Sequence, residues 1–196
     1  MIPKLIAITG GIGSGKSVVS QLLRTMGFTV YDCDERAKWV MTYDERLRSE
    51  LCQLFGADTY LPTADGSWML NRSYLASRIF ASADALAQMN ACVHPAVWRD
   101  LKTQFESERR DRYFFESAIL YESGFDQLSH PDEVWMVSAP LELRIRRAMQ
   151  RDNTLREQVL SRIDSQMPQE EKELRADHII LNDDLHSVIL QVHKLL

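Results

Sequence analysis

Near its amino end the chain reads Gly10-Gly11-Ile12-Gly13-Ser14-Gly15-Lys16-Ser17, which satisfies the pattern G-x-x-x-x-G-K-[ST]. The apolar run Leu5–Thr9 precedes this stretch, and residues with helical periodicity follow it. A glycine-rich turn between a strand and a helix lets successive backbone N–H groups point toward an anion, and the helix N-terminus adds partial positive charge. The pattern therefore predicts a P-loop that binds the phosphates of a nucleotide.

The residue types in this loop suggest a role for each group. Lys16 can reach the β- and γ-phosphates, and the hydroxyl of Ser17 can ligate Mg²⁺. The amides of Ser17 and Val18 are expected to face the α- and β-phosphates. A chance glycine-rich turn is the alternative, and the strand before it and the helix after it argue against that reading. The predicted nucleotide contacts in this stretch are Gly11, Gly13, Ser14, Gly15, Lys16, Ser17 and Val18.

Short apolar runs separated by helical stretches give the fold class. Strands that alternate with helices imply βαβ units, and therefore a parallel sheet covered by helices on both faces. Each run is expected to be a strand buried on both faces. The runs are Leu5–Thr9, Phe28–Tyr31, Tyr113–Ser117, Glu133–Ser138 and His178–Leu181.

Helical periodicity marks the remaining segments. In the first helix Val18, Leu22 and Met26, with Val19 and Leu23 beside them, are expected to face the core, and Gly27 lies just past its end. Residues 38–112 contain helical patterns and no convincing buried strand, which predicts a helical insertion, and Pro95 is expected to interrupt its longest run. The last helix is expected to bury one stripe formed by Leu185, Val188, Ile189, Val192, Leu195 and Leu196.

Composition limits the class of protein. The 196 residues suggest one domain, and 23 basic against 28 acidic side chains give a formal charge of −5, which disfavours coating of nucleic acid. No apolar run approaches the roughly 20 residues that a membrane-spanning helix needs. Cys33, Cys52 and Cys92 form neither a disulfide framework nor a zinc motif. We expect a reduced, cytosolic protein whose oligomeric state the sequence leaves open.

Two charged patterns bear on the reaction. Asp32 and Asp34 directly follow the second predicted strand, where one carboxylate could accept a proton from a substrate hydroxyl and the other could help to hold Mg²⁺. The alternative is that they cap the next helix. Arg144, Arg147 and Arg151 share one helix face and have no opposite charge on that face, whereas Arg146 has Glu142 four residues earlier. Such a face could bind a polyphosphate, or it could be an ordinary solvated basic surface.

Other classes of nucleotide-binding protein remain open at this point. A GTPase would need N-K-x-D and D-x-x-G motifs, and neither string occurs. A switch protein that binds ATP without catalysis would need neither the carboxylate pair nor the arginine face. Another small P-loop kinase, acting on a nucleoside, nucleotide or sugar, is the nearest alternative. No pair of histidines has the spacing of a zinc helix motif, and a lone histidine such as His94 is structural by default.

Several separate strings resemble the motifs of dephospho-CoA kinases, and together they cover nearly the whole chain. They resemble that family's P-loop, V-I-D-A-D, L-H-P, R-x-x-x-R-D, R-I-x-x-Q and A-D…N motifs, in that order. The family's P-loop is more specific than the generic pattern. The strings are Thr9–Ser17, Val30–Asp34, Val93–Pro95, Arg147–Asp152, Arg162–Gln166 and Ala176–Asn182.

The resemblance implies a three-layer α/β fold of the P-loop kinase type, with residues 1–196 as one domain. It implies that the helical insertion over about 38–112 binds the CoA moiety and that a lid spans about 140–170. The implied reaction is ATP-dependent phosphorylation of the ribose 3′-hydroxyl of dephospho-CoA, with Mg²⁺.

The resemblance also implies roles for individual residues. Asp34 is similar to the family's proposed catalytic base, and Arg147 to its lid arginine at the transferring phosphoryl group. Lys16 completes the expected catalytic set. Arg151 and Asn182 are expected to contact ATP, Asn182 at the adenine. The other expected contacts are Thr9, Asp34 and His94 for the acceptor, and Ser17 and Asp32 for Mg²⁺.

Three positions depart from the family pattern. Ala118 stands where the family has a proline after the third strand. Val18 replaces a common threonine, which matters little if only its amide is used. Asp183 and Asp184 follow Asn182 where the family has small residues.

Overall fold

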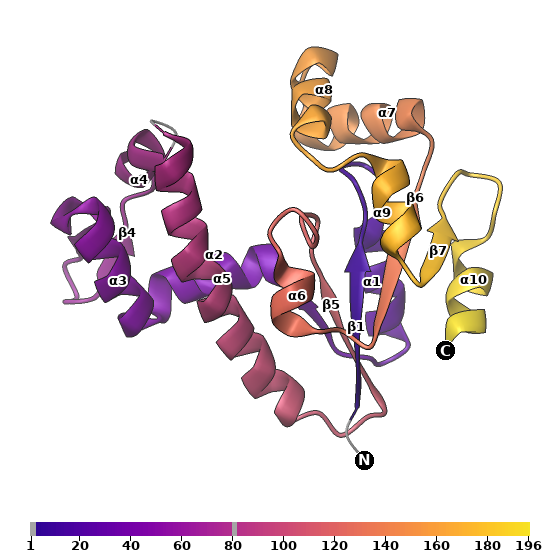
Figure 1. Cartoon of the computed structure of the whole chain (residues 1–196), viewed down its shortest axis with the longest axis horizontal. Helices are drawn as coiled ribbons and strands as arrows, with labels where there is room; N and C mark the ends of the chain where they lie inside the picture. The colour runs from indigo at the N-terminus through magenta and orange to yellow at the C-terminus, as the bar shows by residue number, and fades with distance from the viewer. Residues whose placement is uncertain (1–2, 80–81) are drawn as a thin grey trace. The chain divides into compact units, whose positions relative to one another are not determined.

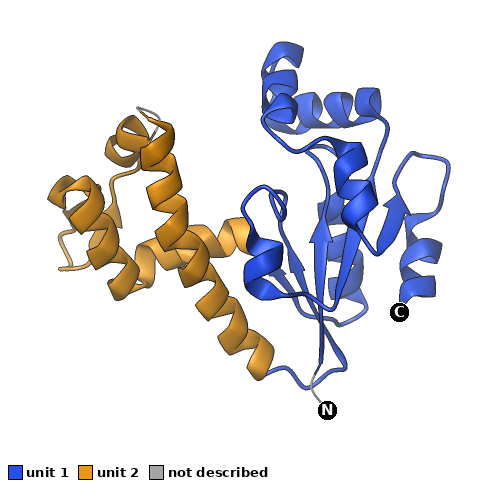
Figure 2. Ribbon diagram, in the orientation of Figure 1, with its two compact units in different colours: residues 1–32, 107–196 blue, residues 33–106 orange. Residues whose placement is uncertain are grey.

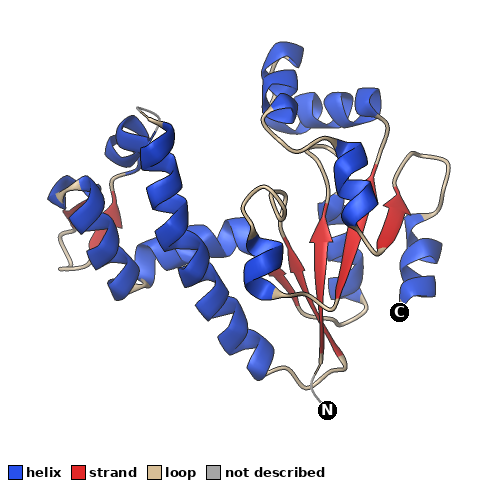
Figure 3. Ribbon diagram, in the orientation of Figure 1, coloured by secondary structure: helices blue, strands red, loops and turns tan. Residues whose placement is uncertain are grey.

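The computed structural model describes residues 3–79 and 82–196. The chain divides into two compact units, one of residues 1–32 with 107–196 and the other of residues 33–106 (Figure 2). The first unit contains a parallel sheet and its helices, and the second is largely helical (Figure 3). The helical unit therefore begins and ends a few residues before the insertion of about 38–112 suggested by the sequence.

The first unit is built on a five-stranded sheet in which every neighbouring pair of strands is parallel (Figure 1). In spatial order the strands are β2 (Val30–Asp32), β5 (Arg112–Glu116), β1 (Lys4–Thr9), β6 (Glu133–Ser138) and β7 (His178–Leu181). Each predicted strand is present with its ends shifted by at most two residues, so the predicted α/β class is confirmed. Because β1 is central, the residues after Thr9 emerge at the middle of the sheet edge where ligands bind in such folds.

Helices cover both faces of this sheet. The helices on the faces are α1 (Lys16–Thr25), α6 (Phe125–Ser129), α9 (Gln169–Arg175) and α10 (Val188–Leu195). Two further helices of this unit, α7 (Leu141–Asp152) and α8 (Arg156–Asp164), pack on each other around a separate buried cluster. Successive strand residues point to opposite faces. Phe114 joins Val19 of α1 and Val192 of α10 in one buried cluster, whereas Phe115 packs edge-on against Phe125 of α6, with ring centroids 5.7 Å apart. Since burial of each large apolar side chain contributes about 1.5–3 kcal/mol, this alternation stabilises the three layers.

The first helix ends as the sequence predicted, and one residue of its predicted stripe, Val18, is not buried. Gly27 adopts a left-handed φ of 86°, and the amides of Gly27 and Phe28 donate to the carbonyls of Arg24 and Leu23, which is a Schellman cap. Val18 was expected in the core and is 53% exposed. Val19 and Leu23 are fully buried, and Leu22 and Met26 pack against the same cluster, because the helix presents its Val19 face to the sheet.

Two expectations about the last strand and the last helix of the chain were wrong. β7 is an edge strand, and Ile179 and Leu181 on one of its faces are exposed, so it is not buried on both faces. The stripe predicted from Leu185 onward is also too wide, because Leu185 lies before the helix and Ile189 is exposed. Only Val192 of that stripe is fully buried.

In its described residues, 33–79 and 82–106, the second unit contains four α-helices, a 3₁₀ turn and one small hairpin. Its elements are α2 (Cys33–Tyr43), α3 (Glu45–Phe55), the 3₁₀ turn η1 (Ala57–Thr59), β3 (Tyr60–Pro62), β4 (Trp68–Leu70), α4 (Arg72–Ile79) and α5 (Ala83–Glu106). The antiparallel β3–β4 hairpin was not predicted, because its strands are three residues long and mostly exposed. Within residues 3–79 and 82–196, no helix is long and apolar enough to cross a membrane.

Pro95 does not interrupt α5, which runs through it from Ala83 to Glu106. Proline removes one helical hydrogen bond and usually breaks a helix at a cost of about 3 kcal/mol. Here Val93, Ala96 and Val97 on either side of it are buried against the other helices of the unit. Tertiary packing therefore outweighs the local preference.

A buried ion pair ties the turn after β5 to α9. Lys172 is fully buried, and its Nζ donates to the carboxylate of Glu122 at 2.6 Å and to the carbonyl of Ala118 at 3.0 Å. Burial lowers the pKa of Lys172, and the pairing with Glu122 opposes that shift. The amine thus helps to fix the turn at the position where this chain lacks the family's proline.

Removal of this amine should destabilise the fold. The substitution Lys172→Met leaves Glu122 without its charged partner, and we expect the free energy of unfolding to fall by about 2–4 kcal/mol in urea titrations. The matched control Lys194→Met, at an exposed position of α10, should change it by less than about 0.5 kcal/mol. Equal losses in the two variants would show that the buried pair contributes nothing specific.

Candidate active site

The predicted P-loop connects the end of β1 to the start of α1, as the pattern requires. Gly15, with a left-handed φ of 95°, immediately precedes the helix, and Gly13 has a φ of 76°. A Cβ atom at Gly13 would overlap the backbone carbonyl of Arg144, and one at Gly15 would overlap the side-chain amide of Asn182. Both positions therefore need glycine for their backbone conformation and for the close approach of other segments.

Side chains satisfy the carbonyl groups of this loop. Lys16 Nζ donates to the carbonyl of Gly10 at 3.0 Å, and Asn182 Nδ2 donates to that of Ser14 at 2.8 Å. The amide of Val18 donates to the carbonyl of Gly15 and begins the helix. The loop thus has a defined shape at a helix N-terminus, which is an arrangement that binds phosphate.

Two hydroxyl groups of the loop region are candidates for contacts with a ligand. Thr9 Oγ1 and Ser14 Oγ are buried and, among the residues that the structure describes, have no hydrogen-bond partner. A buried polar atom without a partner costs about 1–3 kcal/mol. Thr9 was predicted to contact the acceptor, and Ser14 to contact the nucleotide.

Two carboxylates lie at the carboxyl ends of neighbouring strands, at the same edge of the sheet from which the P-loop emerges. Asp32 and Glu116 are opposite each other in the β2–β5 register, and Glu116 also lies opposite Ile8 of β1. Ser20 Oγ, on α1, donates to Glu116 Oε2 at 2.5 Å. Glu116, for which the sequence leaves both a catalytic and a structural role open, is thereby linked to the helix that carries Lys16 and Ser17.

The predicted arginine face contains three different environments. Arg147 donates to the carbonyl of Asn182 at 2.9 Å and to Asp184 Oδ1 at 2.6 Å. Arg151 forms two hydrogen bonds with Asp152, which also accepts from Arg162, and these bonds hold the pKa of Asp152 below its usual range. The acidic partners of Arg147 and Arg151 lie off the shared helix face, at Asp184 in another segment and at the adjacent Asp152. The expectation that this face carries no opposite charge therefore holds, but two of its arginines are paired from outside it.

Arg144 is the third member of that face, and it is buried under the P-loop. It is 5% exposed, and its Nε donates to the carbonyl of Ile12 at 3.0 Å. Its NH1 donates to Gln169 at 2.9 Å, and burial lowers its pKa. A Cβ atom at Gly11 would overlap its guanidinium group, so Arg144 packs directly on the loop.

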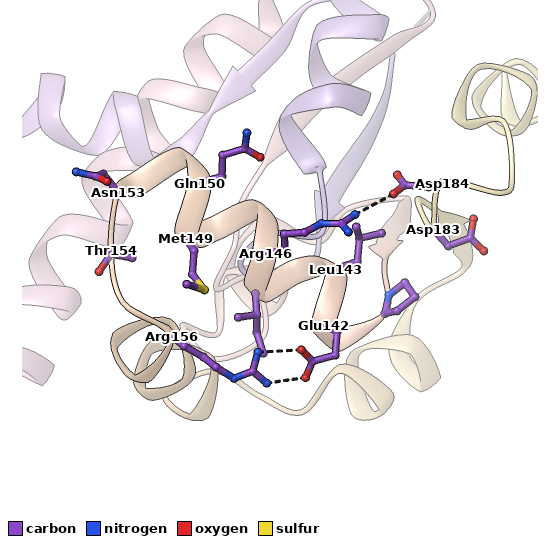
Figure 4. Close-up of a pocket in the computed structure, with 12 residues that line it drawn as sticks. Glu142, Leu143, Arg146, Met149, Gln150, Asn153, Thr154, Arg156, Asp183 and Asp184 are labelled. Carbon is purple, nitrogen blue, oxygen red and sulfur yellow. Dashed lines mark hydrogen bonds and ion pairs between the residues drawn. The ribbon is translucent and has the colours of Figure 1, made fainter.

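A hollow of about 890 Å³ lies beside α7 (Figure 4). Glu142 pairs there with Arg156, and Arg146 pairs with Asp184, so the predicted Glu142–Arg146 pair was wrong. Asp183 and Asp184, which follow the expected adenine contact Asn182, also line it. This hollow therefore borders the segment after β7, and residues 10–17 are not among those that line it.

The other predicted site residues belong to the helical unit. Asp34 lies in the first turn of α2, where the helix dipole favours a negative charge, and His94 lies within α5, just before Pro95. The first unit brings the P-loop, Asn182 and Arg147 together through direct hydrogen bonds. The approach of Asp34 and His94 to these groups stays a prediction.

Comparison with known proteins decides the family. The model of the family described as "Dephospho-CoA kinase" matches residues 4–187. The chain belongs to this family. A dephospho-CoA kinase of Bacteroides fragilis is 45% identical over 97% of this chain and 90% of its own length, and one of Porphyromonas gingivalis is 42% identical over 97% and 92%. Membership makes the chain a kinase and confirms the resemblance seen in its motifs.

Solved structures agree with the fold. The crystal structure of TT1252 from Thermus thermophilus is 35% identical, with a TM-score of 0.83 over all of this chain and 96% of that one. A shikimate kinase from Acinetobacter baumannii is 14% identical, with a TM-score of 0.53, and shares the fold alone. The chain therefore has the P-loop kinase fold expected from its sequence.

Proposed function

We propose that the chain transfers the γ-phosphoryl group of ATP to the ribose 3′-hydroxyl of dephospho-CoA, which yields coenzyme A and ADP. The observation that carries the proposal is the family match over residues 4–187 together with a P-loop at the carboxyl end of the central strand. The cytosolic location expected from the sequence stays a prediction.

The P-loop would hold the phosphates of the donor. The loop leads directly into α1, so an anion there would meet backbone N–H groups and the positive end of the helix dipole. The amides of Ser14 and Val18 already donate to the carbonyls of Gly11 and Gly15, so the expected contact of the Val18 amide with phosphate is not supported. Lys16 would exchange its contact with the Gly10 carbonyl for the β- and γ-phosphates. Arg151 would add positive charge from the lid, and Asn182 would contact the adenine.

Mg²⁺ would bind with the nucleotide. Within residues 3–79 and 82–196, no group of three His, Cys, Asp or Glu side chains could hold a metal by itself. Kinases usually bind Mg²⁺ through one or two protein oxygens together with phosphates and water. The hydroxyl of Ser17 on α1 and the carboxylate of Asp32 at the sheet edge have the required chemistry. The bound ion would neutralise charge on the phosphates.

The acceptor hydroxyl needs a base. Asp34 would accept the proton of the 3′-hydroxyl and orient its oxygen toward the γ-phosphorus, and Thr9 and His94 would contact the acceptor. The lid arginine Arg147 would stabilise the charge that develops on the transferring group. In-line transfer then requires that these groups exclude water from the γ-phosphate, which lid closure would achieve.

The role proposed for Arg147 has a direct kinetic test. We expect Arg147→Ala to lower kcat about 10²-fold and to raise the KM for ATP much less, because the interaction strengthens only as charge develops. Arg146→Ala is the matched control, since Arg146 is the adjacent residue and shares the partner Asp184. A rise in KM alone for Arg147→Ala would make this residue an ordinary binding group.

The choice of acceptor tests the proposed function itself. A coupled assay of ADP release with ATP and Mg²⁺ should show strong stimulation by dephospho-CoA and little by AMP, CMP or shikimate. Preference for AMP or CMP would favour a nucleotide kinase. ATP binding without any acceptor-dependent release of ADP would indicate a nucleotide-dependent switch.

A further inference from the structure

One peptide group at the tip of the P-loop is held from both of its ends. The amide of Ile12 donates to Gln166 Oε1 at 2.9 Å, and the carbonyl of Ile12 accepts from Arg144 Nε at 3.0 Å. Both partners are side chains more than 130 residues away along the chain. These contacts do not use the backbone amides at the start of α1, which would face the phosphates.

The Ile12 side chain enters the packing of the lid. It packs against a buried cluster formed by Ile145 and Ala148 of α7 and Val159 of α8. Arg144 lies on α7, and Gln166 follows the end of α8. Ile12 therefore contacts the α7–α8 segment in two ways. Its peptide group binds Arg144 near the start of the segment and Gln166 just after its end, and its side chain packs against residues of both helices.

The glycine content of the P-loop explains why contacts that hold it in place would favour nucleotide binding. Glycine loses more conformational freedom on ordering than any other residue, and four glycines lie within residues 10–15. Contacts that fix the loop before the nucleotide arrives reduce the entropy that binding must overcome. Gln166 is well suited to this, because its Nε2 also faces the carbonyl of Ala118, at 3.4 Å, in the turn after β5.

We propose that Gln166, with Arg144, is a positioning residue that holds the Ile12 peptide so that the P-loop is preformed for a nucleoside triphosphate. This proposal rests on the proposed function in one respect, that the nucleotide is ATP. It does not depend on which acceptor is phosphorylated.

The test is Gln166→Met, which keeps the length of the side chain and removes both of its hydrogen bonds. Calorimetric titration with ATP and Mg²⁺, without acceptor, should show a dissociation constant about 5- to 20-fold higher. Amide exchange in the peptide that contains residues 10–17 should become faster. The melting temperature of the free protein should fall by no more than about 4 °C, the effect of about 1 kcal/mol in a chain of this size, and the KM for dephospho-CoA should stay within twofold.

Gln158→Met is the matched control, because Gln158 is an exposed glutamine on α8 that accepts a hydrogen bond from the nearby Thr154 hydroxyl and does not contact the P-loop through it. It should change none of these quantities. An ATP dissociation constant within twofold of the original in Gln166→Met would overturn the proposal. So would a fall in melting temperature beyond about 5 °C with equal increases in the KM values for ATP and dephospho-CoA, which would indicate a merely structural role. Since ATP binding is measured directly, a failure to phosphorylate dephospho-CoA would count against the proposed function alone.

Discussion

Replacement of Asp34 by asparagine should lower kcat by about 10²- to 10⁴-fold, the range that loss of a general base produces. Asparagine has nearly the same shape as aspartate and keeps one oxygen, but it cannot accept the proton of the 3′-hydroxyl at neutral pH. The phosphate-binding groups lie in the other unit of the chain, so the dissociation constant for ATP should stay within twofold of the original. Single-turnover rates together with ATP titration separate the two quantities.

Glu35→Gln provides the matched control for this experiment. Glu35 is the next acidic residue in the first turn of α2, so both substitutions remove one negative charge from the same helix end. We expect Glu35→Gln to keep kcat within about threefold of the original. If Asp34→Asn also kept its kcat, Asp34 would not be the base, and its place in the first turn would leave it only a helix-capping role.

Gly13→Ala should have the largest effect on stability among single substitutions in the P-loop. Gly13 has a φ of 76°, and a Cβ atom there would overlap the backbone carbonyl of Arg144 on α7. The left-handed conformation costs a non-glycine residue about 1–2 kcal/mol, and displacement of packed backbone costs about 1–3 kcal/mol more. We expect the free energy of unfolding to fall by about 3 kcal/mol, and ATP affinity to fall at least about tenfold as the loop shifts.

Gly66→Ala is the control that measures only the cost of placing a non-glycine residue in the left-handed conformation, without a steric overlap. Gly66 has a similar φ of 82°, but no heavy atom lies within 4 Å of a Cβ atom placed there. Its substitution should lower the free energy of unfolding by about 1 kcal/mol and leave ATP affinity unchanged. The two variants are compared by urea unfolding. Equal decreases in the free energy of unfolding would mean that the overlap with the Arg144 carbonyl at Gly13 costs no stability.

The sheet was predictable from sequence because its strands are short, apolar and separated by helices. What sequence could not supply was the position of each strand in the sheet. The run at β7 is as apolar as the others, yet only its edge position in the fold leaves Ile179 and Leu181 exposed. For the same reason local patterns could not show that α5 continues through Pro95, since the packing that permits it comes from other helices.

In the candidate site, too, the features that depend on one continuous stretch of sequence were predictable, and those that depend on contacts between distant segments were not. The P-loop is one continuous string whose residue types carry their chemistry, so its position could be read directly. The surroundings of the arginines could not, because their partners come from distant segments: Arg144 meets Ile12, and Arg147 meets Asp184. Gln166 had no predicted role for this reason, although its string resembles a family motif, and no local pattern points from it to the P-loop.

Transfer of label from [γ-³²P]ATP to dephospho-CoA tests the proposed reaction most directly. The label should appear in coenzyme A in equal amount to the ADP formed, and a 3′-specific phosphatase should release all of it. Release of ADP with the label in inorganic phosphate would contradict phosphoryl transfer to the ribose. Label that resists the 3′-specific enzyme would contradict the proposed acceptor hydroxyl.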